Sequence, residues 1–199
     1  MKKFIYYNIM LFLFVTLNSK SFAQLPKLDT SYLYWGESTK LGVQDFLIKV
    51  NGKIPGHSSG QFGIEVDPLV GRFSFGVSRN YKKLIRNYFH RSSSWIDTTS
   101  DPTPILRYYQ IMWDMWEVQV RKFRQDVSLN RKVIYKGLLT FKELESTRRI
   151  DFANWLIKYE TETEFGRNEE KLTYWEKKIQ EMLDELKDYD ITALPELIK

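Results

Sequence analysis

The chain has 199 residues, of which 43% are hydrophobic, 28% are charged and none is cysteine. Without cysteine, the protein can form neither a disulfide nor a lipidated N-terminal cysteine. The formal net charge is +5, but three of the 30 Lys and Arg residues lie in the first 23 positions, which leaves 27 basic against 25 acidic residues. This balance does not favour a nucleic-acid partner or an anionic membrane surface, because both require a concentrated basic face.

Residues 1–23 have the pattern of a secretory signal peptide. Two lysines precede an apolar run, and Ser21-Phe22-Ala23 places small residues where signal peptidase cleaves. The apolar run is shorter than the roughly 20 residues of a membrane span. We therefore expect residues 24–199 to form a single domain without a transmembrane segment, secreted across the inner membrane and either periplasmic or extracellular.

The first half of the mature chain carries β-strand and turn patterns. The segments with strand character are SYLYW (31–35), VQDFLIKV (43–50), QFGIEVD (61–67), VGRFSFGV (70–77) and LIRNYFH (84–90). VNGK (50–53) and DPLVG (67–71) supply turns, and RSSSW (91–95) is a polar link that ends in a tryptophan. These patterns predict a small N-terminal β-sheet.

After residue 100 the pattern becomes helical. Thr103 followed by Pro104 predicts an N-cap with proline at the first helical position, and the helix should run to about residue 127. Further helices are expected at 141–164 and 169–188. The buried stripe of the last one is predicted at Leu172, Trp175, Ile179, Met182 and Leu186. The predicted fold is α+β, with a small N-terminal sheet packed on about three C-terminal helices.

Six polar side chains of the first predicted helix recur at spacings of three and four residues and share one face. They are Arg107, Gln110, Asp114, Glu117, Arg121 and Arg124. Within this set, Glu117 and Arg121 are spaced as a favourable i, i+4 pair. The remaining surface of this helix is apolar, which predicts a central core helix that is covered on most sides. Met112 and Met115 could suggest a copper(I) site, but without a cysteine or a nearby histidine we interpret them as core residues.

Two segments of the chain carry the pattern of a known family. The first, ILRYYQIMWDMWEVQVRKFR (105–124), follows LLxHEQxHFDIxExxARKLR, with Gln110, Asp114, Glu117, Arg121, Lys122 and Arg124 in register. The second, YETETEFGRNEEKLTYWEKKI (159–179), follows YDxETxHGxNxxxQxxWxxxI, with Tyr159, Glu162, Thr163, Gly166, Asn168, Trp175 and Ile179 in place. The chain thus resembles a family of secreted bacterial proteins that are predicted zinc proteases of otherwise unknown function, and the likeness extends over nearly the whole mature chain.

The resemblance implies a zincin-like fold, but the chain departs from the family at the positions that would do the chemistry. The two HExxH histidines, which would bind zinc, are replaced by Tyr108 and Met112, and the glutamate that would activate water is Tyr109. The histidine of the second segment is Phe165. Methionine and phenylalanine cannot complete a zinc site, so we expect zinc to be lost, no other cofactor, and a former active centre filled by packing.

These departures predict a degenerate, non-catalytic family member that acts by binding or as a structural element of the cell envelope or exterior. If it binds a peptide or protein, we expect the site in a cleft beside the first helix, bordered by Tyr108, Tyr109 and Phe165. The alternative is a secreted metal-dependent peptidase with an altered site, in which Tyr108, His57 or His90 and carboxylates hold the metal. A third possibility is carbohydrate binding, which requires several tryptophans exposed in one plane.

Two further patterns have weaker chemical meaning. GHSSG (56–60) matches G-x-S-x-G with Ser58 as the nucleophile, but a strand pattern rather than a helix follows it, so we interpret it as a chance match. The acidic run YETETEFGRNEE (159–170) could supply a glycosidase pair, but it falls at the end of one predicted helix and the start of the next. We interpret that run as a solvated connector.

Overall fold

The computed structural model describes residues 30–50, 58–66, 81–137 and 139–191. The chain divides into two units, Met1–Thr30 and Ser31–Lys199, and every element described below belongs to the second. The predicted signal peptide of residues 1–23, the predicted strand at 70–77 and the turn at 67–71 lie outside the described residues.

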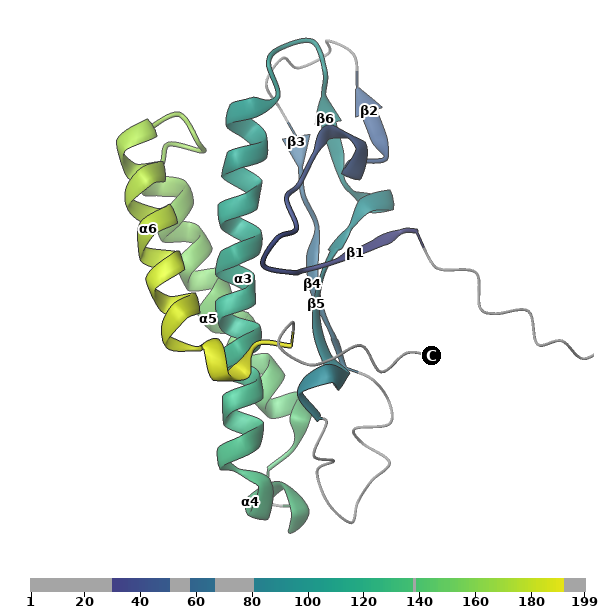
Figure 1. Cartoon of the computed structure of the whole chain (residues 1–199), viewed down its shortest axis with the longest axis vertical. Helices are drawn as coiled ribbons and strands as arrows, with labels where there is room; N and C mark the ends of the chain where they lie inside the picture. The colour runs from purple at the N-terminus through teal and green to yellow at the C-terminus, as the bar shows by residue number, and fades with distance from the viewer. Residues whose placement is uncertain (1–29, 51–57, 67–80, 138, 192–199) are drawn as a thin grey trace, which may run out of the picture. The chain divides into compact units, whose positions relative to one another are not determined.

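Within the described residues, six short strands form two three-stranded sheets (Figure 1). They are β1 (Tyr32–Tyr34), β2 (Ile48–Val50), β3 (Ser58–Ser59), β4 (Phe62–Val66), β5 (Ile85–His90) and β6 (Trp95–Asp97). The first sheet has the order β1-β5-β4 and is antiparallel, with Leu33 and Phe62 both opposite Phe89. In the second sheet, β6 pairs in parallel with β2 and antiparallel with β3. The prediction of one small sheet was therefore too simple.

Only the second half of the strand predicted at 43–50 is extended. Val43–Asp45 form a 3-10 turn, η1, because the Asp45 carboxylate accepts the Gly42 amide at 2.9 Å and the Phe46 amide folds back to the Val43 carbonyl. A hydrogen bond from the backbone to a nearby side chain competes with the backbone hydrogen bonds of a β-sheet. Asp45 itself is buried and lies 3.4 Å from Arg91.

Four α-helices follow the strands, one more than predicted. They are α3 (Thr103–Leu129), α4 (Arg131–Tyr135), α5 (Phe141–Glu162) and α6 (Glu169–Glu185), and a 3-10 turn, η4 (Lys187–Tyr189), follows α6. The short α4 was not predicted, and α6 ends before residue 188. Thr103 is the first residue of α3 rather than its N-cap, and its N–H and hydroxyl both donate to the Asp101 carboxylate, at 3.0 and 2.7 Å.

Helix α3 lies between the strands on one side and α5 with α6 on the other (Figure 1). Its Trp113, Met115 and Phe123 are completely buried, which confirms the prediction of a central core helix. Of the predicted stripe, Leu172, Trp175 and Ile179 in α6 and Leu186 just after it are buried, while Leu183 takes the place expected for Met182. The architecture is thus α+β, with small sheets preceding the helices.

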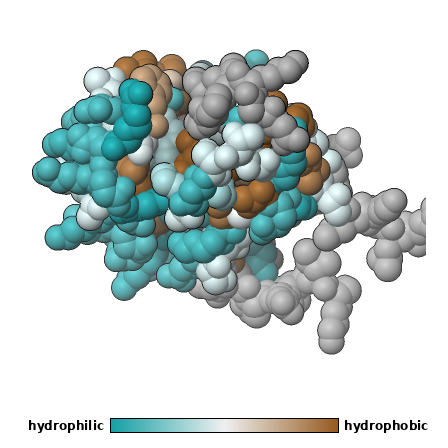
Figure 2. Space-filling model, turned by 90° about the horizontal axis from the view of Figure 1, so that it is seen from above, coloured by the Kyte–Doolittle hydropathy of each residue, from teal (hydrophilic) through white to brown (hydrophobic). Residues whose placement is uncertain are grey.

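The face of the molecule seen in Figure 2 is largely hydrophilic, with apolar areas between the polar side chains. Within the part of the chain that the structure describes, no helix combines the length and apolar character needed to cross a membrane.

Candidate functional site

The two family-like segments meet at Tyr108 of α3. The Tyr108 ring stacks on that of Tyr159 from α5, with 5.1 Å between centroids and 18° between planes. The Tyr159 hydroxyl donates to the Tyr108 carbonyl at 3.0 Å, and Tyr159 also packs edge-on against Trp175 of α6 at 5.6 Å. Aromatic side chains of α3, α5 and α6 therefore form one connected cluster that joins the three helices.

The turn between α5 and α6 is held by residues of the second family-like segment. Thr163 is completely buried; its hydroxyl donates to the Tyr159 carbonyl at 2.7 Å and accepts the Gly166 amide at 3.4 Å. The Trp175 indole N–H donates to the Glu162 carboxylate at 2.8 Å. These contacts give Glu162, Thr163 and Trp175 a structural role, and Glu162 does not belong to a solvated connector as the acidic run suggested.

Glycine is required at position 166 for two reasons. Its φ of 87° lies in the left-handed region, and a Cβ there would approach the Tyr108 ring at 3.0 Å. Gly137 is a matched control, with a φ of 70° and open space where an added Cβ would lie. Both substitutions place alanine in a left-handed backbone conformation, but only at residue 166 does the added Cβ also clash with a neighbour. We therefore expect Gly166→Ala to lower the free energy of unfolding by about 1–2 kcal/mol more than Gly137→Ala. Urea denaturation of both variants tests this; equal losses would contradict it.

The other former-site positions on α3 are also enclosed. Tyr109 is 7% exposed, and its hydroxyl donates to the Ser58 carbonyl at 2.8 Å, which ties α3 to β3. Met112 is 6% exposed and belongs to the core. Burial raises the pKa of Tyr108 and of Tyr109, and the nearby Glu160 carboxylate raises the pKa of Tyr108 further. Both phenols therefore stay neutral near pH 7 and act as hydrogen-bond donors.

The expectation that Phe165 helps to fill the former active centre is wrong. Its side chain is 63% exposed, and its φ of 57° follows a φ of 51° at Glu164, so the turn runs through three consecutive left-handed residues. The predicted cleft is wrong as well, because the rings of Tyr108 and Tyr109 are buried rather than lining an open groove. Tyr108, Tyr109 and Met112 pack as expected; Phe165 does not.

A second arrangement involves the polar face of α3, which is covered by segments far away in the sequence. The Asp114 Oδ1 atom accepts the Trp35 indole N–H at 2.8 Å and the Gln110 amide at 2.9 Å. Gln110 in turn accepts the backbone N–H of Leu41 at 2.9 Å. Desolvation raises the pKa of Asp114, although these hydrogen bonds and the charge of Lys40 oppose the shift. Gln110 and Asp114 thus fix the segment that follows β1 onto α3.

Farther along the same face lies a buried ionic cluster of Glu117, Arg121 and Arg124. Glu117 Oε1 lies 3.3 Å from Arg121 Nε and 2.8 Å from Arg124 Nη1, and all three side chains are at most 4% exposed. Arg121 also pairs with Asp190 at 3.1 Å and donates to the Leu183 carbonyl. The predicted i, i+4 pair of Glu117 and Arg121 is confirmed, but it anchors the end of α6 rather than a solvated surface.

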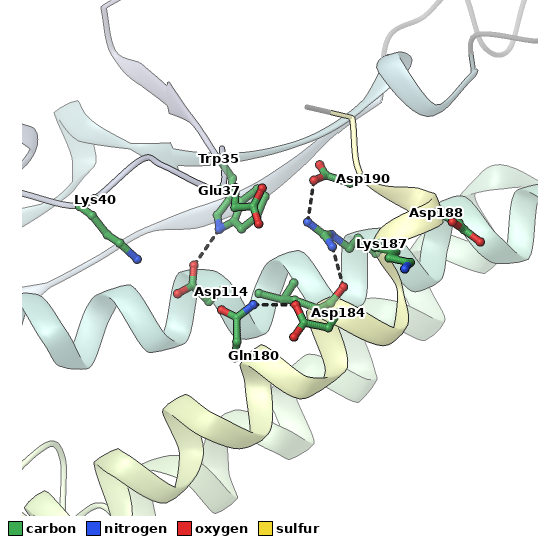
Figure 3. A pocket seen from close by; sticks show the side chains of 11 residues that line it. Trp35, Glu37, Lys40, Asp114, Gln180, Asp184, Lys187, Asp188 and Asp190 are labelled. Carbon is green, nitrogen blue, oxygen red and sulfur yellow. Dashed lines mark hydrogen bonds and ion pairs between the residues drawn. The ribbon is translucent and has the colours of Figure 1, made fainter. Parts of the chain in front are cut away.

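Between these two polar groups a cavity of about 340 Å³ opens on α3 (Figure 3). Its walls come from the segment after β1, from α3, from α6 and from η4. The lining residues are Trp35, Glu37, Lys40, Asp114, Arg121, Gln180, Leu183, Asp184, Lys187, Asp188 and Asp190. Of these, sequence reasoning singled out only Asp114 and Arg121, as members of the family pattern. Trp35 ends a strand-like run, and no pattern linked it to α3.

The remaining chemical candidates that the structure describes, Ser58 and His90, do not form a site. Ser58 lies in β3 and is followed by another strand, so it does not stand on the strand-to-helix turn that a G-x-S-x-G nucleophile requires. His57 lies outside the described residues. His90 stacks on Tyr32 with 4.8 Å between ring centroids, on the face of β5 opposite to Phe89, which packs against α3.

The described residues do not assemble a metal site or an open aromatic plane for a sugar. No group of three or more His, Asp or Glu side chains in that part of the chain is placed to hold a metal ion. Trp35, Trp113, Trp116 and Trp175 are buried, and Trp155 is partly buried against the core, so they do not present an open aromatic plane to a sugar.

Comparison with known proteins adds no relative: neither a family model, nor a curated protein, nor a solved structure matches this chain.

Proposed function

We propose that this protein is a secreted, non-catalytic binding or structural protein of the cell envelope or exterior, built on a degenerate zincin-like scaffold. The observation that carries the proposal is the state of the positions where the resemblance would put the zinc ligands and the base. Tyr108, Tyr109 and Met112 are buried in the core, and the two phenols are engaged in structural contacts.

The contact between the two family-like segments supports the scaffold part of the proposal. In an HExxH protein, a further ligand must approach the helix that carries the two histidines. Here Gly166, which follows the position of the family's additional histidine, lies against the Tyr108 ring. A chain that has lost its ligands but retains this juxtaposition is what a degenerate member of such a family would be.

Zinc content and peptidase activity test the proposal. The mature natural protein is expected to contain far less than one zinc per chain after dialysis and to show no chelator-sensitive peptidase activity. The variant Tyr108→His, Tyr109→Glu, Met112→His places two histidines at i and i+4 on α3 and is expected to gain zinc affinity. A matched variant with Phe at 108 and 109 and Leu at 112 adds no ligand and should gain none. Stoichiometric zinc in the natural protein, or cleavage that a chelator abolishes, would overturn the proposal.

A further inference from the structure

We propose that the cavity between Trp35, Asp114 and η4 binds an ammonium group, carried either by a free organic amine or by a lysine side chain of a peptide. This inference rests on the proposed function, since it gives a binding protein its site and the chemistry of its ligand. It also moves that site away from the predicted cleft at Tyr108, to the polar face of α3.

The charges of the lining favour a cation. Arg121 is already paired with Asp190 and Glu117, at 3.1 and 3.3 Å, and it donates to the Leu183 carbonyl at 2.7 Å, so it cannot turn toward a ligand without breaking these contacts. The lining then retains four carboxylates, those of Glu37, Asp114, Asp184 and Asp188, against two lysines, Lys40 and Lys187. An anionic ligand would meet an excess of like charge here.

Asp114 supplies the anchoring atom. Its Oδ1 accepts two hydrogen bonds, from Trp35 and Gln110, and these hold the carboxylate in one orientation. Its Oδ2 accepts none from the residues that the structure describes, although Asp114 lines the cavity. An ammonium donor at Oδ2 would form a charge-assisted hydrogen bond, which is stronger than a bond between neutral groups. Figure 3 shows the Lys40 side chain extending toward Asp114 from the opposite wall.

The size and the lining of the cavity suit a small ligand and do not suit a sugar or a metal ion. A volume of about 340 Å³ falls at the lower end of small-molecule sites, well above the space for one water molecule. Trp35 is only 6% exposed, and the Arg121 guanidinium lies 5.2 Å from its ring centroid, so the indole forms a wall rather than a free platform for a sugar. The acids of the lining do not form a metal-ligand group among the described residues.

The test is titration of the mature protein with cadaverine, with a blocked Ala-Ala-Lys-Ala-Ala peptide, with the same peptide containing norleucine, and with glutarate. Binding is followed by isothermal calorimetry and by the indole N–H resonance of Trp35, assigned by its loss in Trp35→Phe. Cadaverine, the lysine peptide or both should shift this resonance saturably, because its acceptor is Asp114. The tighter of the two identifies the source of the ammonium group.

Three variants make the test specific. Asp114→Asn keeps an acceptor for Trp35 and removes the charge, so the Kd should rise about 10- to 100-fold, as expected for loss of a hydrogen bond to a charged group. Asp151→Asn, on α5 and away from the lining, makes the same change and should leave the Kd unchanged. Lys40→Gln removes an internal competitor for Asp114 and should tighten binding.

The Asp114→Asn protein should remain folded. The difference in stability between this variant and the natural protein should depend on pH. Because the pKa of Asp114 is raised in the folded state, the folded protein holds this proton more firmly than the unfolded chain. Stability is therefore lost as the pH rises from the ordinary aspartate range through the raised pKa. Asp114→Asn should melt at a higher temperature than the natural protein at pH 7, and the difference should shrink below about pH 4.

Three results would overturn the inference. The first is the absence of a saturable shift with either amine at about 10 mM, which is well above a weak Kd of about 1 mM. The others are equal binding by the natural protein and Asp114→Asn, or binding of glutarate and the norleucine peptide in place of the amines. These outcomes leave the non-catalytic proposal intact. Conversely, zinc-dependent peptidase activity would overturn that proposal without altering amine binding at Asp114.

Discussion

Replacing Glu117 with alanine is expected to lower the free energy of unfolding by about 3–5 kcal/mol, the loss typical of breaking a buried ion pair. Glu117 is completely buried, and one of its oxygens contacts both Arg121 and Arg124. Without it, Arg121 keeps its ion pair with Asp190, whereas Arg124 is left with the backbone carbonyls of Ile85 and Tyr189 and no carboxylate among the described residues. Equilibrium denaturation by urea, monitored by circular dichroism, measures the loss.

The location of the damage provides a second measurement. Arg124 donates to the carbonyls of Ile85 and Tyr189, so the cluster ties β5 and η4 to α3. We expect the amides of residues 187–190 to exchange faster with deuterium in Glu117→Ala. The control is Glu181→Ala on α6, whose pair with Lys177 spans 3.9 Å at the surface and should contribute less than about 1 kcal/mol. Similar losses in both variants would contradict a special role for the buried cluster.

Replacing Trp113 with alanine should be comparably damaging, with a loss of about 3–5 kcal/mol for the large-to-small change alone. Trp113 is fully buried, and its indole N–H donates to Asn87 Oδ1 at 3.1 Å. Asn87 is itself 1% exposed and lies on the inward face of β5, so an unpaired amide oxygen there adds about 1–3 kcal/mol. Thermal and urea unfolding of the purified variant tests the prediction.

Two milder changes keep this prediction measurable if Trp113→Ala does not fold. Trp113→Phe keeps most of the ring and loses the hydrogen bond, so its loss should be smaller than that of the alanine variant. Tyr174→Ala removes a ring that is 52% exposed on α6 and should change stability by less than about 1 kcal/mol. A loss below about 1 kcal/mol for Trp113→Ala would show that the core collapses around the missing ring.

The predictions that held concern features encoded within one helical turn. The spacing of apolar residues predicted the three long helices, the central position of α3 and the burial of Trp175. Helix boundaries also follow local signals, because Thr140 with Glu143 and Asn168 cap α5 and α6 with their side chains. The i, i+4 spacing similarly predicted the contact between Glu117 and Arg121.

The failures arose where local geometry or distant segments override a pattern. Phe165 was expected to pack because it is aromatic, but consecutive left-handed residues in the turn leave it exposed. The 43–50 strand was shortened by one carboxylate, that of Asp45, which closes a turn on Gly42. The second sheet escaped prediction because its strands are only two or three residues long and pair across large separations.

The sequence by itself determined that six polar residues share one face of α3, since helical periodicity is a local property. It could not determine that Glu117, Arg121 and Arg124 of this face are buried, or that distant segments partly cover Gln110 and Asp114. That was decided by Trp35, which lies 79 positions before Asp114, and by Tyr189, which lies 65 positions after Arg124. Which segments cover a helix face depends on the packing of the whole chain, because a buried polar group is stable only where distant partners satisfy its hydrogen bonds. The cavity at Asp114 exists for the same reason and is a product of the tertiary structure alone.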